Sequence, residues 1–292
     1  MEHTIILYYK YIAIKNPREL VESEREICEK LGLRGRIIIA EEGINGTLEG
    51  EAQAMEKYCA NLKSDPRFSD IQFKTSVGTG NAFPRLNVKV RSEIVTLGVP
   101  GNTHAEFTRG TYLPPDRLHE WYEKGEDFVV IDMRNRYESE VGRFENSIAV
   151  PIKNFRELPR VIEKLASLKN RKVVTVCTGG VRCEKASGYL VEQGFKDVYQ
   201  LHGGIHTYLE KYPEGKFQGG LYVFDGRIVM KVAPEEKRKI IGKCARCTQP
   251  SEDYTNCANT ECHVHFICCK NCRRSEGEFC SEECKEKQWS IV

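Results

Sequence analysis

The sequence lacks a long apolar run and a strong excess of either charge. No apolar stretch reaches the roughly 20 residues that a membrane-spanning helix needs, so we expect no membrane partner. The first residues, MEHTIILYYKYIAIK, place no basic segment before their apolar residues and do not resemble a signal peptide. The net charge is only +2, so any nucleic-acid surface has to be a local patch. We therefore expect a cytoplasmic protein.

The sequence also lacks the glycine fingerprint of nicotinamide-binding and flavin-binding proteins. Nothing in it indicates an oligomeric state. A chain of 292 residues is too long to fold around a single hydrophobic core, so we expect two or three domains.

Cysteine, in contrast, is abundant and unevenly placed. Nine of the 13 cysteines fall between positions 244 and 284. In a chain without an export signal this clustering indicates metal binding rather than disulfides. The segment is short and polar, so we expect a metal to stabilise it in place of an apolar core. The predicted ligands form four pairs: Cys244 and Cys247, Cys257 and Cys262, Cys269 and Cys272, and Cys280 and Cys284.

Four cysteine pairs suit two structural, tetrahedral zinc ions. One arrangement gives the first and third pairs to one zinc and the second and fourth pairs to the other. The spacing leaves this partition open, because Cys268, His263 and His265 are further candidate ligands. The two histidines with a carboxylate would also suit iron. We favour zinc because the histidines lie inside a zinc-type cluster.

The segment VVTVCTGGVRCEKASGYL at 173–190 is the most informative stretch of the chain. Its β-branched start predicts a buried parallel strand that stops at Cys177. A helix is expected from Cys183 to Leu190. Backbone N–H groups of the loop and the helix N-terminus should converge on one point and favour negative charge there. The predicted loop residues are Thr178, Gly179, Gly180 and Val181, with Arg182 as the last.

Cys177 is the predicted reactive group. The helix dipole and Arg182 both favour its thiolate, so its pKa should fall below the ordinary value of about 8.5. The alternative is a small core residue at the end of a strand. We favour the nucleophile because Cys-x4-Arg closes the strand-to-helix turn with a permanent charge. Cys183 is a candidate resolving thiol that would form a disulfide with Cys177, although packing beneath the loop is an equally good interpretation.

The first hundred residues alternate strand and helix signals in the order βαββαβ. Strands are expected at 5–14, at 35–50 as two strands around a turn, and at 71–77, with helices at 17–32 and 51–63. This order predicts a ferredoxin-like, acylphosphatase-like domain over residues 1–101. Glu41 and Glu42 could act in acid–base chemistry. We favour a polar strand connection, with Asn45-Gly46 supplying the positive φ.

Two basic stretches are candidate RNA contacts, because Lys and Arg bind phosphates and exposed aromatic rings stack on unpaired bases. A solvated strand face and a solvated helix face are the alternatives. The first stretch, with Phe73 and Phe83 interleaved, carries Lys74, Arg85, Lys89 and Arg91. The second carries Lys237, Arg238 and Lys239.

Turn-forming residues at 102–115 predict a linker to a second domain at 116–215. A buried strand at 128–134 and a crossover helix at 155–169 precede the strand that ends at Cys177. This alternation predicts a doubly wound parallel sheet, whose sites lie beyond the carboxyl ends of its strands. A β-hairpin at 216–232, with Asp225-Gly226 at its turn, is expected to open the last domain, 216–292.

Two stretches resemble a rhodanese domain: VVIDMRNRYESEVGRFENS at 129–147 resembles its opening strand and turn, and YLVEQGFKDVYQLHGGI at 189–205 resembles its closing part. The resemblance implies a sulfane sulfur held as a persulfide on Cys177. It also implies that Asp132 and Arg134 form structural hydrogen bonds and ion pairs rather than catalytic contacts.

With its first domain and its cysteine-rich tail, the whole chain resembles the rhodanese-like, oxygen-dependent tRNA uridine(34) 5-hydroxylase family. The resemblance implies a tRNA partner, molecular oxygen as a substrate, 5-hydroxyuridine as the product, and Cys177 and Arg182 as catalytic residues. It also implies that the first domain handles the substrate. Proteins of this family usually carry cysteine where Leu221 stands, so no role for a cysteine there carries over.

Two other functions compete with this one. A thiosulfate or persulfide sulfurtransferase would use the same loop but would leave the first domain and the metal-binding tail without a purpose. A non-enzymatic RNA- or protein-binding module would not need Cys177, which is present.

Overall fold

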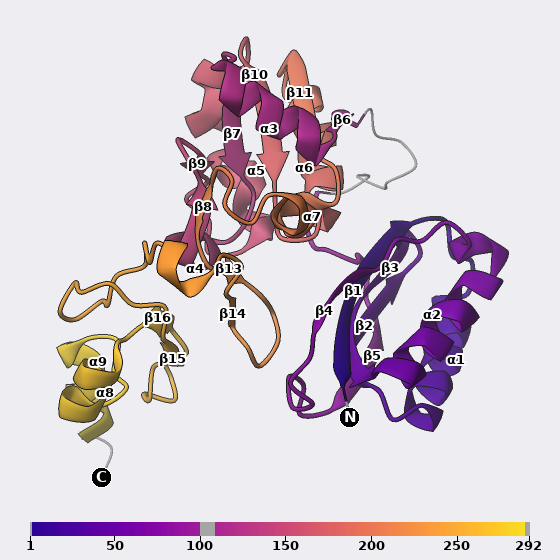
Figure 1. Ribbon diagram of the computed structural model, residues 1–292, viewed down its shortest axis with the longest axis horizontal. Helices are drawn as coiled ribbons and strands as arrows, with labels where there is room; N and C mark the ends of the chain where they lie inside the picture. Colours follow the sequence, from indigo (N-terminus) through magenta and orange to yellow (C-terminus); the bar gives the residue numbers. More distant parts are fainter. Residues whose placement is uncertain (1, 100–108, 290–292) are drawn as a thin grey trace.

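A computed structural model describes residues 2–99 and 109–289. Three parts follow one another along the chain (Figure 1). Among the residues described, no helix is both long enough and apolar enough to cross a bilayer.

The N-terminal part is a five-stranded sheet in the order β4-β1-β3-β2-β5, covered on one face by two helices (Figure 1). Side chains alternate across β1, so Ile6 and Tyr8 join the core beneath the helices while Leu7 and Tyr9 face the other way. The predicted ferredoxin-like arrangement is confirmed, with β5 added parallel to β2. The elements are β1 (His3–Tyr11), α1 (Pro17–Lys30), β2 (Arg34–Ala40), β3 (Gly43–Glu51), α2 (Ala52–Ser64), β4 (Lys74–Val77) and β5 (Leu86–Val90).

The turn between β2 and β3 is not where the sequence predicted it. Asn45 and Gly46 lie inside β3, paired with both neighbouring strands. The chain turns at Glu41 and Glu42, and Gly43, with φ 151°, adopts the conformation that a side chain disfavours. The Asn-Gly signal was outweighed because this strand is central in the sheet and pairs over its full length.

The central part is a parallel sheet in the order β6-β11-β10-β7-β9. Separate apolar clusters cover its two faces, one beneath α3 and α7 and the other beneath α5 and α6, so the predicted doubly wound sheet is confirmed. The strands of this sheet are β6 (Thr111–Leu113), β7 (Val129–Asp132), β9 (Ile148–Ala149), β10 (Lys172–Val176) and β11 (Asp197–Leu201), and β8 (Gly142–Phe144) lies outside it. Its helices are α3 (Pro115–Lys124), α4 (Arg136–Val141), α5 (Leu158–Val161), α6 (Val181–Glu192) and α7 (Gly204–Lys211).

Three local expectations differ from the structure of this part. The predicted crossover helix at 155–169 is broken into the short helix α5 between two 3-10 segments, Phe155–Glu157 and Ile162–Leu168. Helix α6 begins at Val181 rather than at Cys183, so Val181 and Arg182 are helical. Part of the predicted linker, β6, pairs with β11, while residues 102–108 lie outside the described residues.

The C-terminal part begins with β12 (Phe217–Gly219), which pairs with β8, and the hairpin of β13 (Leu221–Tyr222) and β14 (Val229–Met230). The predicted hairpin with Asp225-Gly226 at its turn is confirmed, since Ile228 N–H donates to Asp225 O at 2.9 Å, although the connection runs from 223 to 228 and the positive φ, 59°, falls on Ile228. The Asp225 carboxylate accepts hydrogen bonds from the backbone and side chain of Arg227. The cysteine-rich tail follows with β15 (Tyr254–Asn256), β16 (His265–Ile267), α8 (Lys270–Glu276) and α9 (Glu282–Trp289).

The uncovered face of the N-terminal sheet packs against the start of α6 and against the hairpin. Lys185 of α6 is fully buried, and its Nζ lies 2.8 Å from Glu42 Oε1 and 2.5 Å from Glu93 Oε2. From the hairpin, Gly226 N–H donates to Ala82 O at 2.7 Å, and Arg227 Nη1 donates to Ser76 Oγ at 2.9 Å. Glu42 therefore holds two parts of the chain together, which agrees with the structural interpretation preferred over acid–base chemistry.

Candidate active site and metal centres

Cys177 lies directly after β10, at the carboxyl end of the central strand of the parallel sheet. The loop turns back so that Gly180 N–H donates to Cys177 Sγ at 3.2 Å, with Gly180 at φ 102°. Helix α7 fixes the other side of the loop, because Ile205 N–H and His206 N–H donate to the carbonyls of Cys177 and Thr178 at 2.9 and 3.0 Å. The sulfur therefore sits in a rigid cradle of main-chain groups.

The surroundings of Cys177 favour its thiolate. Burial disfavours the charge, but hydrogen bonding by Cys183, the charge of Arg182 and backbone N–H groups of α6 outweigh it and lower the pKa of Cys177 to about 6. Burial and the neighbouring thiolate raise the pKa of Cys183, which therefore stays protonated and donates to Cys177. None of the described cysteines forms a disulfide. The structure thus packs Cys183 beneath the loop and in contact with Cys177, and its resolving role stays a prediction.

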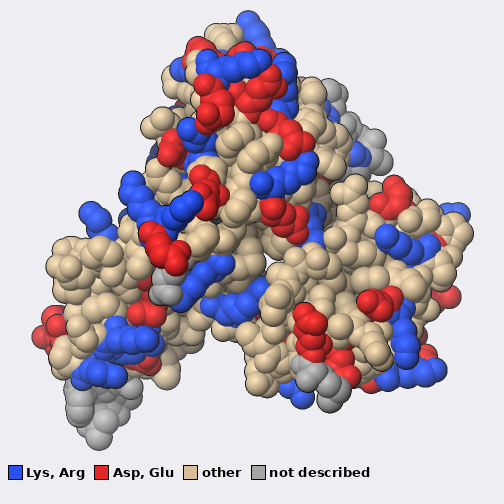
Figure 2. Space-filling view, viewed as in Figure 1, with Lys and Arg blue, Asp and Glu red and all other residues tan. Residues whose placement is uncertain are grey.

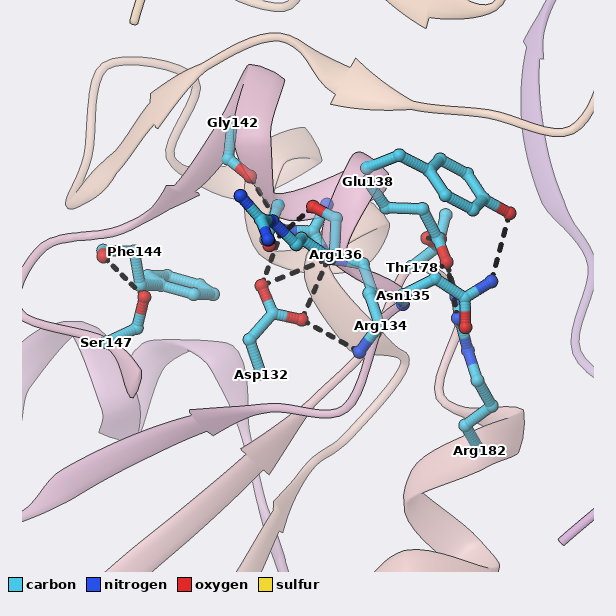
Figure 3. A network of polar contacts seen from close by, with 12 residues as sticks. Asp132, Arg134, Asn135, Arg136, Glu138, Gly142, Phe144, Ser147, Thr178 and Arg182 are labelled. Carbon is cyan, nitrogen blue, oxygen red and sulfur yellow. Dashed lines mark hydrogen bonds and ion pairs between the residues drawn. The ribbon is translucent and has the colours of Figure 1, made fainter. Parts of the chain in front are cut away.

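Glu138 holds Arg182 in place through two hydrogen bonds of 2.6 and 2.8 Å (Figure 3). Both side chains are almost fully buried. Burial alone would lower the pKa of Arg182, but Glu138 and the Cys177 thiolate raise it, so the guanidinium keeps its charge. Sequence reasoning missed this partner of Arg182, since Glu138 comes from α4, far away in the chain.

Asp132 and Arg134 form a separate buried ion pair beside this network (Figure 3). Arg134 Nη2 also donates to Gly142 O at 2.6 Å, which ties the end of β7 to β8. These contacts are structural, as the sequence resemblance implied.

A cavity of about 630 Å³ lies between the uncovered face of the N-terminal sheet, the loop after Cys177 and the β13–β14 hairpin. Cys177 is among its lining residues, and its side chain is fully buried. Leu7 and Tyr9 of β1 approach the loop so closely that a Cβ at Gly179 would lie 2.7 Å from Leu7 Cδ2, and one at Gly180 would lie 2.8 Å from Tyr9 Oη. The two glycines thus allow the N-terminal part to form the wall of the reactive site.

Among the charged side chains that line the cavity the basic ones predominate, and its two acids, Glu93 and Asp225, are paired with Lys185 and Arg227. Such a lining suits an anionic ligand. Figure 2 shows Lys and Arg side chains over the hairpin strand β14, on the side near the N-terminal sheet. The basic residues that line the cavity are Arg36, Lys74, Arg91, Arg156, Arg182 and Arg227.

Besides Cys177, Lys74 and His206 are the titratable groups of the cavity lining whose pKa values are lowered. Lys74 is buried with its Nζ 5.3 Å from the centre of the Tyr9 ring, and burial lowers its pKa, although the Cys177 thiolate opposes this effect. Burial, Lys74 and Arg227 lower the pKa of His206 to about 4, so its ring is neutral at physiological pH.

The predicted RNA contacts divide into two groups. From the first stretch, Lys74 and Arg91 line the cavity, Arg85 lines a neighbouring hollow, and Lys89 is exposed on β5. The side chains of the second stretch are paired within the chain: Lys237 pairs with Glu214, Arg238 pairs with Glu252, and Lys239 donates to Gln218.

Sequence reasoning missed the wall residues Tyr9, Arg36, Arg156 and Arg227. Strand alternation was the available signal for Tyr9 and Arg36, because their neighbours Tyr8 and Ile37 belong to the core beneath the helices.

The eight paired cysteines of the tail form two groups of four. Cys244, Cys247, Cys269 and Cys272 form one group, and Cys257, Cys262, Cys280 and Cys284 form the other, with all ligand atoms of a group within 4.8 Å of one another. These are the groups obtained by joining the first pair with the third and the second with the fourth. Either group could therefore hold a metal ion in a tetrahedral site.

The surroundings of both groups fit a bound metal. Cys269 N–H donates to Cys244 Sγ and Cys280 N–H donates to Cys257 Sγ, each at 3.4 Å, as backbone groups do for metal-bound thiolates. The buried cluster of this segment consists almost entirely of cysteines, with Phe266 and Phe279 as its large apolar members. His265 bonds to Tyr222 and Asn256 instead, and Cys268 lies outside both groups.

The parallel sheet and the cysteine loop at its edge define a rhodanese-type domain with additions on both sides. The rhodanese-like domain family matches residues 114–211, the family described as UPF0176 acylphosphatase like domain matches residues 3–94, and the one described as rhodanase C-terminal matches residues 218–285. Among solved structures, a rhodanese-like domain from Anabaena is 23% identical with a TM-score of 0.32, covering 37% of this chain and 78% of that one.

Similarity to known proteins extends over nearly the full length of the chain. A tRNA uridine(34) hydroxylase of Bacillus licheniformis is 42% identical over 288 residues, which cover 97% of this chain and 88% of that protein. A tRNA uridine(34) hydroxylase of Cytophaga hutchinsonii is also 42% identical, over 97% of this chain and 90% of that protein. The chain belongs to the tRNA uridine(34) hydroxylase family.

Proposed function

We propose that this protein is an enzyme that hydroxylates the wobble uridine of tRNA at C5 to give 5-hydroxyuridine, with molecular oxygen as the oxygen source. One oxygen atom enters the C5–H bond, and the other leaves as water after it takes two electrons and two protons from an external reductant of the thiol class. The observation that carries the proposal is the cavity whose lining combines Cys177 with six basic side chains. Its main wall is the sheet of the acylphosphatase-like domain, so substrate handling is assigned to that domain. A simple sulfurtransferase would not need this wall.

Cys177, as a thiolate or persulfide, is the reactive group, and Arg182 stabilises its negative charge from α6. Lys74, Arg36 and Arg91 attract the RNA backbone to the cavity. Cys183, buried in the first turn of α6, is the proposed resolving thiol that would form a disulfide with Cys177 after oxidation.

We further propose that each group of four cysteines holds one zinc ion. Zinc would have a structural role there, since four thiolate ligands leave no open coordination position for a substrate. The protein acts in the cytoplasm, where tRNA is found. Its three domains are residues 1–101, 111–215 and 216–292, since β6 (Thr111–Leu113) belongs to the sheet of the second domain.

The test is mass spectrometry of tRNA nucleosides from cells that lack the protein. Wild type should restore 5-hydroxyuridine, and Cys177→Ala should not. Cys59→Ala, which changes a half-buried thiol of α2 outside the cavity, should restore it like wild type. Unchanged 5-hydroxyuridine in the knockout would remove the proposed function, and restoration by Cys177→Ala would remove the proposed reactive centre.

A further inference from the structure

A second hollow, of about 470 Å³, adjoins the active-site cavity on the other side of the β13–β14 hairpin. The two hollows share Arg36 and the hairpin residues Val223, Phe224 and Asp225 as lining residues. The hairpin loop is therefore the partition between them.

Phe224 is the exposed residue of this partition. Its side chain is 40% exposed, so a ligand can reach the ring. Two guanidinium groups lie near the ring, with the Cζ atoms of Arg36 and Arg182 at 6.0 and 5.8 Å from the ring centre. Phe224 and Arg182 both line the cavity that contains Cys177, so the ring lies close to the reactive site.

The loop that carries Phe224 is fixed in place. Arg36 Nη2 donates to the carbonyl of Phe224 at 2.7 Å, and Gly226 N–H donates to Ala82 O at the same distance. Arg227 bonds to Asp225 of the loop and to Ser76 of β4. An exposed ring on a fixed loop can stack on a ligand with little loss of conformational entropy.

The second hollow itself has the chemistry of a site for an unpaired nucleobase with its phosphate. Tyr222, Phe83 and Pro84 contribute flat or apolar surface, while Arg36 and Arg85 contribute positive charge. The acid in its lining, Asp225, is neutralised by Arg227 at 2.7 Å. Aromatic surface beside arginine is the combination that binds single-stranded nucleic acid.

We propose that the second hollow binds the base next to the reacting uridine in the same RNA strand, and that Phe224 stacks between the two bases. This inference rests on the proposed function for the identity of the substrate. In this arrangement the Phe224 ring separates the reacting base from its neighbour, so that a single base enters the cavity above Cys177. Arg85 contacts the phosphate of the neighbouring nucleotide.

The test uses the full-length protein and an anticodon stem-loop RNA that carries 2-aminopurine beside the uridine, on one side in one RNA and on the other side in a second. Stacking on Phe224 should change the 2-aminopurine fluorescence when wild type binds one of the two RNAs. Phe224→Ala should abolish the change and raise the KM for hydroxylation roughly tenfold or more, with a smaller effect on kcat. Phe224→Tyr, which keeps the ring, should restore both.

Two further variants separate this role from a fold defect. Arg85→Gln, which alters the second hollow alone, should also raise KM and leave the melting temperature unchanged. Ile148→Ala, a change of another exposed apolar residue on the distant strand β9, should behave as wild type. Wild-type fluorescence changes and KM in Phe224→Ala would overturn the inference while the proposed function stands. The opposite result is a wild type whose fluorescence change depends on Phe224 but which does not hydroxylate the RNA. That result would overturn the proposed function and leave the stacking role of Phe224 standing.

Discussion

The reactivity of Cys177 depends on a balance between burial and charge. A fully buried thiol would ordinarily stay protonated, as Cys28 shows, since burial among apolar residues raises its pKa. At Cys177 the same penalty is outweighed by the hydrogen bond from Cys183 and the charge of Arg182. Glu138 fixes that charge without reaching the sulfur, so it acts as a positioning residue.

This balance predicts how alkylation of Cys177 depends on pH. Only the thiolate reacts, so the rate should rise with pH and reach half its maximum near pH 6, the pKa of the thiol. Replacing both members of the ion pair, Arg182→Met with Glu138→Gln, removes the stabilising charge without leaving a buried carboxylate unpaired. The midpoint should then move upward by about one pH unit or more. Mass spectrometry of the peptide containing Cys177 after timed alkylation measures both midpoints.

Cys59 is an internal control in the same samples, because burial raises its pKa to about 11 and its alkylation should begin only at higher pH. A Cys177 midpoint close to that of Cys59, or one that does not move in the double variant, would contradict the proposed role of Arg182.

The loop between β10 and α6 connects the sulfur to the N-terminal sheet. Gly180→Ala combines a strained backbone at φ 102° with a Cβ 2.8 Å from Tyr9 Oη, so the sheet would have to move away from the loop. We expect hydroxylation to fall at least roughly tenfold, because displacement of this wall changes the cavity above Cys177. The activity of the purified variant on anticodon stem-loop RNA measures the effect.

Gly194→Ala is the matched control for this change. Gly194 has a similar positive φ of 86°, but a Cβ there would have nothing within 4 Å. It should cost about 1 kcal/mol of stability from backbone strain and leave the activity intact. Equal losses of activity in the two variants would mean that strain, rather than the contact with Tyr9, causes the defect.

Lys185 of α6 is the main charged link between the central and N-terminal parts. Lys185→Met would leave the carboxylates of Glu42 and Glu93 without their common cation. Glu42 is the more deeply buried of the two carboxylates. We expect a loss of about 3–5 kcal/mol in the free energy of unfolding, measured by urea denaturation.

Adding Glu42→Gln to Lys185→Met should recover part of this loss, because it removes the more buried of the two charges. Lys57→Met, at an exposed position of α2, should change stability by less than about 0.5 kcal/mol. If Lys185→Met costs no more than Lys57→Met, the ion pairs do not hold the two parts together.

The sequence predicts those features that depend on neighbouring residues. The β-branched run before Cys177 predicts β10. The glycines and the arginine after it predict the cradle of main-chain groups around the sulfur, because both features depend on local patterns. The Asn45-Gly46 signal predicts a turn that does not form, because pairing of β3 with two strands outweighs a local preference. The cavity could not be predicted, since Tyr9 and Phe224 meet Cys177 only through the packing of separate parts.

The three parts of the chain are stabilised in different ways. The N-terminal and central parts have apolar cores on their sheets, whereas the described tail has a buried cluster made mainly of cysteines. Without metal this segment has too little apolar surface to offset the entropy of folding. Its contacts with the rest pass through aromatic residues, such as Tyr254, whose hydroxyl donates to Tyr137 O beside the network of Glu138.

The tail should therefore unfold when metal is removed, while the two sheets remain folded. The purified protein should contain two zinc ions per chain by elemental analysis, and Cys247→Ser and Cys284→Ser should each reduce the content to one, because these residues belong to different groups. Zinc binding contributes on the order of 10 kcal/mol to such sites, so a chelator should expose the tail to proteolysis. Cys268→Ser is the control, since Cys268 lies outside both groups and the content should stay at two. A loss of zinc in Cys268→Ser, or iron in place of zinc, would contradict the assignment of the eight ligands and reopen the role of the histidines.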